Sequence, residues 1–159
     1  MEVESTVDPL TGLFDRRGFD DIFARMVESS QRSERPLGLL YMDSDSLKSI
    51  NDRSGHEAGN RFIVDLASIL RNVARRSDFI FRWGADEFAV VLDSGNAARA
   101  ATLAERLRKA VAERTEGTMS IGIYWGVPES ADEAVRIADT AMYDAKRRGK
   151  DRVVVNLQE

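Results

Sequence analysis

The chain has 159 residues, 43% of them hydrophobic and 31% charged, and a net charge of −4. This length suits one domain with its own core, and the acidic balance argues against general binding to nucleic acid or an anionic membrane. The absence of cysteine excludes disulfides and thiol catalysis, and no segment is long and apolar enough to span a membrane. We therefore expect a single cytoplasmic domain, residues 1–159, without nucleic-acid or direct membrane contact.

Hydrophobic periodicity predicts alternating helices and strands along the chain. A helix begins near Arg16, and Phe19, Ile22, Phe23 and Met26 form its apolar face. The sequence then predicts a strand at 37–42, a short helical piece at 46–51, a helix from about 57, a hairpin at 78–92, a helix at 96–114, a strand at 119–125, a helix at 131–148 and a strand at 152–155. Strands interleaved with helices, together with one hairpin, indicate an α/β (α+β) domain with a five-stranded mixed sheet and flanking helices.

Three carboxylates carry the first functional signal. The nearly all-apolar run 37–42 predicts a central strand that is buried on both faces, and Asp43 ends it. Asp86 and Glu87 are adjacent at the tip of the hairpin, where their like charges repel unless a cation or a metal-bound polyphosphate is present. If the strand and the hairpin are neighbours, Asp43 and Asp86 converge into a magnesium site. The alternative is that Asp43 caps the short helix and the other two are solvated turn residues.

Lys48 and Asn51 lie three residues apart on the short helical piece and therefore share a face. The lysine can meet a phosphate, and the amide offers a donor and an acceptor to a base edge. The alternative for this pair is a structural or exposed role. His56, the one histidine, we interpret as a loop-packing residue.

Several ordered motifs together resemble the GGDEF domain, the catalytic domain of diguanylate cyclases, over nearly the whole chain. The matching segments, in chain order, are 8–13, 16–17, 43–52, 55–60, 84–88 and 120–123. A last block consists of residue 139, residues 143–146 and residues 149–150. The resemblance implies a fold similar to the palm of nucleotide polymerases and class III nucleotidyl cyclases. It also implies condensation of two GTP into cyclic di-GMP with loss of two pyrophosphates. Each domain binds one GTP, so a homodimer is needed for turnover, and the domain is expected to be part of a longer signalling protein.

The resemblance also assigns roles to residues. It implies that Asp43 and Asp86 are ligands of Mg²⁺, with Mn²⁺ as a substitute, and that Glu87 is a second-metal ligand or base. The other implied substrate contacts are Lys48, Lys146 and Lys150 to the triphosphate, Asn51 and Asn60 to guanine, and the backbone of Gly84 and Ala85 to phosphate.

Two residues depart from the family pattern. Ala85 stands in place of a second glycine, and if that position needs a positive φ, alanine costs about 1–2 kcal/mol there. Asn60 stands in place of an aspartate that accepts twice from guanine, and an amide also matches adenine. We expect reduced rather than abolished activity, and weakened or relaxed purine selectivity.

Arg75 and Asp78 have the spacing of the family's RxxD inhibitory site, just ahead of the hairpin. Arginine binds phosphates and guanine edges well, so the resemblance implies that cyclic di-GMP binds here and restrains the enzyme. The alternative is an ordinary basic helix end. For the whole chain two further interpretations stay open, a degenerate domain that binds GTP or cyclic di-GMP without turnover and a structural domain that only dimerises its host.

Overall fold

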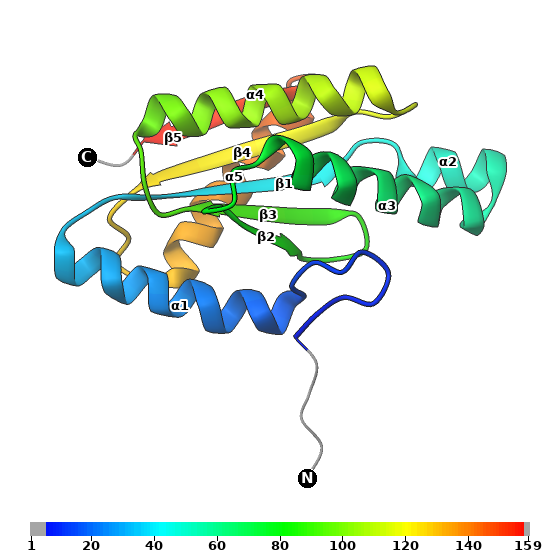
Figure 1. Ribbon diagram of the computed structural model, residues 1–159. Helices are drawn as coiled ribbons and strands as arrows, with labels where there is room; N and C mark the ends of the chain where they lie inside the picture. Colours follow the sequence, from blue (N-terminus) through cyan, green and yellow to red (C-terminus); the bar gives the residue numbers. More distant parts are fainter. Residues whose placement is uncertain (1–5, 158–159) are drawn as a thin grey trace, which may run out of the picture.

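The computed structural model describes residues 6–157 and contains one five-stranded sheet with helices on both faces (Figure 1). The strand order is β2-β3-β1-β4-β5, in which β4 and β5 are parallel and the other neighbours antiparallel. The predicted domain of 1–159 extends at both ends beyond the described residues. The elements are α1 (Arg16–Ser33), β1 (Leu37–Ser44), α2 (Leu47–Ser54), α3 (His56–Val73), β2 (Phe79–Arg82), β3 (Glu87–Leu92), α4 (Ala97–Arg114), β4 (Met119–Gly126), α5 (Ala131–Arg147) and β5 (Arg152–Leu157).

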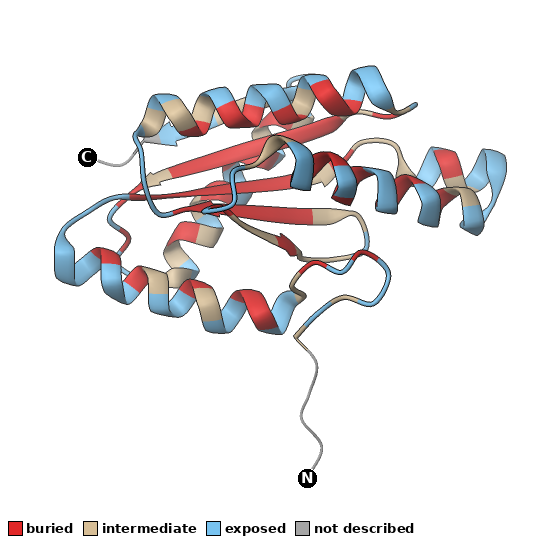
Figure 2. Ribbon diagram, viewed as in Figure 1, coloured by how far each residue is buried: buried red, intermediate tan, exposed pale blue. Residues whose placement is uncertain are grey.

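The sheet separates two hydrophobic cores. Helices α3 and α4 cover one face, where Leu40 and Met42 of β1 point, and helices α1 and α5 cover the other, where Leu39 and Tyr41 point. Figure 2 shows the resulting band of buried residues along the central strands. The near-continuous apolar run of β1 is thereby explained, because both of its faces are covered.

Helix α5 lies directly on the backbone of β4. A Cβ added at Gly122 would overlap the carbonyl oxygen of Ala138 and the backbone nitrogen of Met142, so this close approach requires glycine. The approach brings the C-terminal part of α5 to the end of the sheet where β1 finishes. Lys146 is thereby carried to the same end of the sheet as Asp43.

The predicted order of elements and the five-stranded mixed sheet are confirmed. The short helical piece lies slightly later than expected, as α2. Strand β1 runs through Asp43 to Ser44, so Asp43 is inside the strand rather than at its end. The capping alternative for Asp43 is wrong, because Ser46 occupies the N-cap of α2. Within residues 6–157, no helix combines the length and the apolar character that a bilayer crossing requires.

Candidate active site

The antiparallel pairing of β1 with β3 brings the predicted carboxylates together. Asp43 lies opposite Glu87 in the register, and the backbone nitrogen of Ser44 donates to the carbonyl oxygen of Asp86 at 3.1 Å. Glu87 is the first residue of β3, so its interpretation as a turn residue is wrong, and Asp86 lies in the turn but is half-buried rather than fully solvated. The expected convergence of Asp43 and Asp86 is a property of this fold.

The charges at this position are unbalanced. Burial and the nearby charge of Asp86 raise the pKa of Asp43 to about 7, and Lys146 only partly opposes them. Burial also raises the pKa of Asp86. Two carboxylates that resist ionisation side by side form an oxygen donor set that suits a hard divalent cation.

Glu87 has a different environment from the other two carboxylates. The hydroxyl of Tyr41 donates to Oε2 of Glu87 at 3.0 Å, and a Cβ on Gly84 would overlap Oε1. Glycine at 84 is therefore needed for this position of Glu87. In the described part of the chain, no three acidic or histidine side chains gather closely enough to hold a metal ion, so the metal-ligand role of Glu87 stays a prediction.

Tyr41 is a functional candidate that sequence reasoning missed. It lies in the apolar run of β1 and is itself buried, so the sequence pattern indicates only a core residue. Burial and the neighbouring charge of Glu87 raise the pKa of the Tyr41 hydroxyl, which keeps it protonated and able to donate. Burial and the charge of Glu87 also raise the pKa of Asp139 in α5.

The backbone at Ala85 does not have the conformation that we expected. In residues 6–157, the non-glycine residues with positive φ are Glu34, Lys150 and Asp151. Ala85 is therefore not in the left-handed region, and the predicted strain of about 1–2 kcal/mol is wrong. The side chain of Ala85 is exposed and nothing in the fold penalises it.

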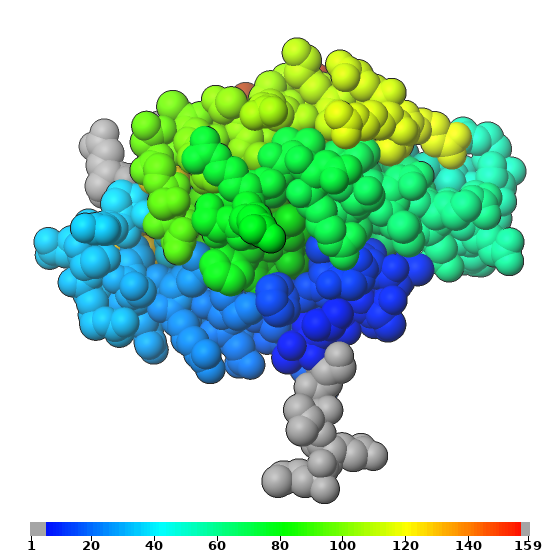
Figure 3. All heavy atoms as spheres, in the orientation of Figure 1, coloured from blue at the N-terminus to red at the C-terminus, as the bar shows by residue number. Residues whose placement is uncertain are grey.

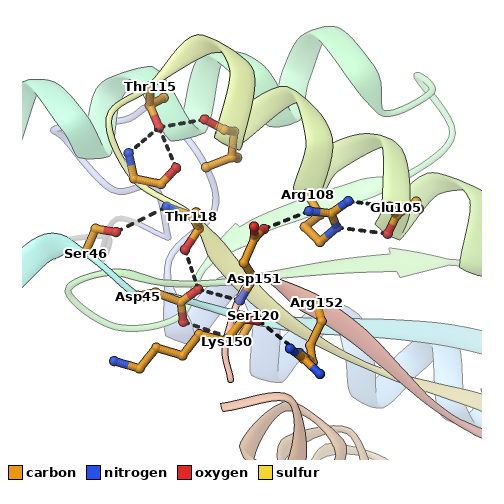
Figure 4. Close-up of polar contacts among 12 residues, drawn as sticks. Asp45, Ser46, Glu105, Arg108, Thr115, Thr118, Ser120, Lys150, Asp151 and Arg152 are labelled. Atoms are coloured by element: carbon orange, nitrogen blue, oxygen red, sulfur yellow. Dashed lines mark hydrogen bonds and ion pairs between the residues drawn. The ribbon is translucent and has the colours of Figure 1, made fainter. Parts of the chain in front are cut away.

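Asp45 forms the centre of a polar network at the end of β1 (Figure 4). Its side chain is only 3% exposed and accepts hydrogen bonds from four donors. The donors are Thr118 Oγ1 at 2.7 Å, Ser120 Oγ at 2.7 Å, Lys146 Nζ at 2.8 Å and Asp151 N at 3.1 Å. Although burial alone would raise the pKa of Asp45, the bonds from Lys146, Ser120 and Thr118 hold it below the usual range. The sequence contains Asp45 two residues after Asp43, but spacing does not reveal which carboxylate is structural.

Lys146 lies among the carboxylates of its own chain. Its Nζ is 2.8 Å from both Oδ1 of Asp45 and the carbonyl oxygen of Ser44, and 3.7 Å from Oδ2 of Asp43. It therefore supplies the positive charge that links Asp45 to the Asp43–Asp86 pair. The triphosphate contact implied by the resemblance stays a prediction for Lys146.

The other predicted substrate residues come from three parts of the chain: Lys48 and Asn51 from α2, Asn60 from the start of α3, and Lys150 from the connection between α5 and β5. Lys48 lines an open cavity of about 540 Å³ together with Asp45. Oδ1 of Asn51 is buried and has no hydrogen-bond partner among residues 6–157, and it packs against Gly59, where a Cβ would overlap it. Asn60 and Lys150 are exposed, and Lys150 has a φ of 65°.

His56 is exposed at the first turn of α3, so its interpretation as a packing residue is wrong.

The predicted inhibitory pair is close in space but differently arranged. The backbone nitrogen of Arg75, not its guanidinium, donates to Oδ2 of Asp78 at 2.8 Å. The Asp78 side chain is 1% exposed and is held by Nη2 of Arg99 at 2.8 and 3.0 Å. The Asp78 carboxylate is thus paired with Arg99, which sequence reasoning missed. The side chain of Arg75 is exposed, beyond the end of α3.

Comparison with known proteins identifies the family of this chain. The family described as "Diguanylate cyclase, GGDEF domain" matches residues 5–152. Diguanylate cyclase DosC of Escherichia coli K12 is 36% identical over 162 residues, which cover 94% of this chain and 35% of DosC. Diguanylate cyclase A of Treponema denticola is 36% identical over 140 residues, with 82% of this chain and 38% of that protein covered. This chain belongs to the GGDEF domain family.

Solved structures show the same fold. The GGDEF domain of DgcB from Caulobacter crescentus, in complex with c-di-GMP, has a TM-score of 0.92 and 30% identity, covering 98% of this chain and 95% of that one. The diguanylate cyclase SiaD of Pseudomonas aeruginosa, in complex with its activator SiaC, has a TM-score of 0.89 and 34% identity, covering 96% and 62%. The chain spans about a third of the length of the first curated relatives it matches.

Proposed function

We propose that this domain is a diguanylate cyclase, which condenses two GTP into cyclic di-GMP with release of two pyrophosphates. The observation that carries the proposal is the half-buried pair of Asp43, in β1, and Asp86, directly before β3, with a pKa of about 7 at Asp43. Carboxylates under such mutual repulsion are suited to bind Mg²⁺ or Mn²⁺. The names of the relatives, which are diguanylate cyclases, support the same reaction.

Each residue of the site has a part in this proposal. Asp43 and Asp86 hold the divalent ion, which when bound stabilises developing negative charge on phosphate. Glu87, oriented by the Tyr41 hydroxyl, acts as general base or as a further ligand. The negative charge of the triphosphate is neutralised by three lysines, Lys48, Lys146 and Lys150. The backbone at Gly84 and Ala85 lies along the triphosphate. Asn51 and Asn60 contact the base, and Asn60 is the departure that relaxes purine selectivity and lowers activity.

Two domains must face each other, because each supplies one GTP. The rate per domain should therefore rise with protein concentration. The test is pyrophosphate release from GTP with Mg²⁺ at high protein concentration, compared between the wild type and Asp86→Ala. The control is Asp93→Ala, which removes an exposed carboxylate next to the far end of β3.

We expect turnover in the wild type and the control, and none in Asp86→Ala. GTP binding without any pyrophosphate release would refute the cyclase and would favour a receptor without turnover. Absence of any nucleotide binding would refute both the cyclase and the receptor, and would leave the third alternative, a structural domain that only dimerises its host.

We also propose that cyclic di-GMP binds near Arg75, whose exposed guanidinium is free of the Asp78 carboxylate. The relative DgcB crystallised with c-di-GMP supports this class of ligand. Arg75→Ala should abolish product binding at this position in calorimetry. The control is Arg114→Ala, which changes an exposed arginine at the C-terminal end of α4, whereas Arg99, the partner of Asp78, is near the start of that helix. An unchanged stoichiometry in Arg75→Ala would contradict the proposal.

A further inference from the structure

Arg82 joins two parts of the chain that are far apart in sequence. It is the last residue of β2, and its Nη1 lies 3.1 and 3.2 Å from the two carboxylate oxygens of Asp8. Its Nε lies 3.2 Å from the carbonyl oxygens of both Gly84 and Ala85, and its Nη2 lies 2.7 Å from that of Ala85. One guanidinium therefore contacts a carboxylate on one side and two turn carbonyls on the other.

The two carbonyls that Arg82 binds belong to the residues directly before Asp86. A guanidinium is planar and rigid, so its five N–H groups keep fixed directions relative to one another. When Asp8 fixes one edge of this plane, the orientation of the other edge is fixed as well. The backbone that leads into Asp86 is thereby held in one arrangement.

The ion pair is well shielded from solvent. The side chains of Arg82 and Asp8 are 18% and 15% exposed, so their attraction is weakened less by water than that of a surface pair. Asp8 is fixed in turn by Thr11, whose backbone nitrogen and hydroxyl donate to Oδ2 at 2.9 and 2.7 Å. Both ends of the link are therefore ordered by several hydrogen bonds.

Asp8 belongs to the N-terminal loop, residues 6–15, which is added to the edge of the sheet. Phe14 forms a bridge with Phe81 of β2, and its carbonyl oxygen accepts from the backbone nitrogen of Arg82 at 2.8 Å. Figure 3 shows the N-terminal residues, in blue, packed beneath the green segments that follow in the chain. The described residues that precede α1 are thus coupled to the turn that carries Asp86.

We propose that Arg82 is a positioning residue for the metal site, and that Asp8 makes the geometry of the Gly84–Asp86 turn depend on the N-terminal loop. This inference rests on the proposed function, because it assigns Asp86 to the metal. Residues that orient metal ligands from outside the coordination sphere contribute about 10-fold to 100-fold to metal affinity. A displacement of the N-terminal loop would therefore change metal binding without touching the ligands.

The test measures Mn²⁺ affinity by electron paramagnetic resonance, in the presence of a non-cyclisable GTP analogue. The variants are Asp8→Asn, Arg82→Lys and the double variant, and thermal unfolding is recorded for each. Glu105→Gln is the matched control, since it also turns a carboxylate paired with an arginine into an amide, but on α4 away from the hairpin. Asp8→Asn leaves every residue of the Asp43–Asp86 pair and the turn unchanged.

We expect about tenfold weaker Mn²⁺ binding in both single variants, no further loss in the double variant, and wild-type binding in Glu105→Gln. The affinity of the metal-free analogue should stay the same in all of them. Lower unfolding temperatures with unchanged Mn²⁺ affinity would overturn the inference, because Arg82 would then be only structural. Absence of Mn²⁺ binding in the wild type would instead overturn the proposed function, and the inference with it.

Discussion

Nζ of Lys146 lies 2.8 Å from Oδ1 of Asp45, in a position where both side chains are largely buried. This ion pair ties the C-terminal part of α5 to the end of β1. It also explains why Lys146 is found among carboxylates, since Asp45 offers it a full negative charge that Asp43, with its raised pKa, does not.

Replacing Asp45 by asparagine should destabilise the domain strongly. The amide removes the charge that faces Lys146 and can accept fewer of the four hydrogen bonds. Breaking one partner of a buried ion pair costs about 3 kcal/mol or more, which urea denaturation would detect. Asp65→Asn, an exposed change on α3, should cost less than about 0.5 kcal/mol. Equal midpoints for the two variants would show that the network is dispensable.

Asp43→Asn should make the domain more stable at pH 8 while removing activity. The folded-state pKa of about 7 lies above the unfolded value of 3.8, so the native state binds a proton more tightly. The contribution of Asp43 to stability is therefore present below about pH 4 and is lost as the pH rises through 7. The gain in the variant is on the order of 1 kcal/mol, or about 2–4 °C.

Unfolding temperatures of the wild type and Asp43→Asn, measured without divalent ions from pH 4 to 8, check this prediction. The two curves should separate as the pH rises. A constant difference across this range would contradict it. Adding Mg²⁺ with a GTP analogue should raise the unfolding temperature of the wild type but not that of Asp43→Asn.

Tyr41→Phe should lower turnover with little change in GTP affinity. The variant removes the hydroxyl that donates to Oε2 of Glu87, and a hydrogen bond to a charged group contributes about 1.5–3 kcal/mol. We expect kcat to fall on the order of tenfold. Tyr124→Phe is the control, because the buried Tyr124 hydroxyl has no hydrogen-bond partner in the described part of the chain and its loss should leave kcat unchanged. Equal rates in both variants would remove Tyr41 from the site.

Ala85→Gly should not increase activity. The backbone at Ala85 is not left-handed, so glycine relieves no strain there. We expect rates within about twofold of the wild type and a loss of stability of about 0.5 kcal/mol, because glycine has more freedom in the unfolded chain. A large rise in turnover would mean that the side chain itself obstructs the substrate.

Asn60→Asp should increase the preference for GTP over ATP. A carboxylate accepts from two donors of guanine, whereas the wild-type amide accepts once and also suits adenine. The difference of one good base contact is about 1–3 kcal/mol, so discrimination should rise about tenfold. Product analysis with GTP, ATP and an equal mixture checks it. Strict use of GTP by the wild type, with unimpaired affinity, would refute relaxed selectivity.

The sequence predicts most of this fold because its signals are local. The apolar run of β1 and the periodic faces of α1, α3, α4 and α5 are read from residues close together in the chain. The convergence of Asp43 with Asp86 is also predictable, since it follows once β1 and the hairpin are neighbours. The error about Ala85 arose because a residue type indicates, but does not fix, a backbone angle.

Residue types and spacing by themselves determined the family and the order of elements, and they pointed to the carboxylates of the candidate site, because these depend on chemistry that each segment carries alone. Only the tertiary structure decided which carboxylate is structural, that Arg99 pairs with Asp78, that Tyr41 donates to Glu87 and that Arg82 links Asp8 to the turn before Asp86. Each of these pairs joins side chains from different elements. Their contacts arise from packing across the sheet, which no local pattern in the chain encodes.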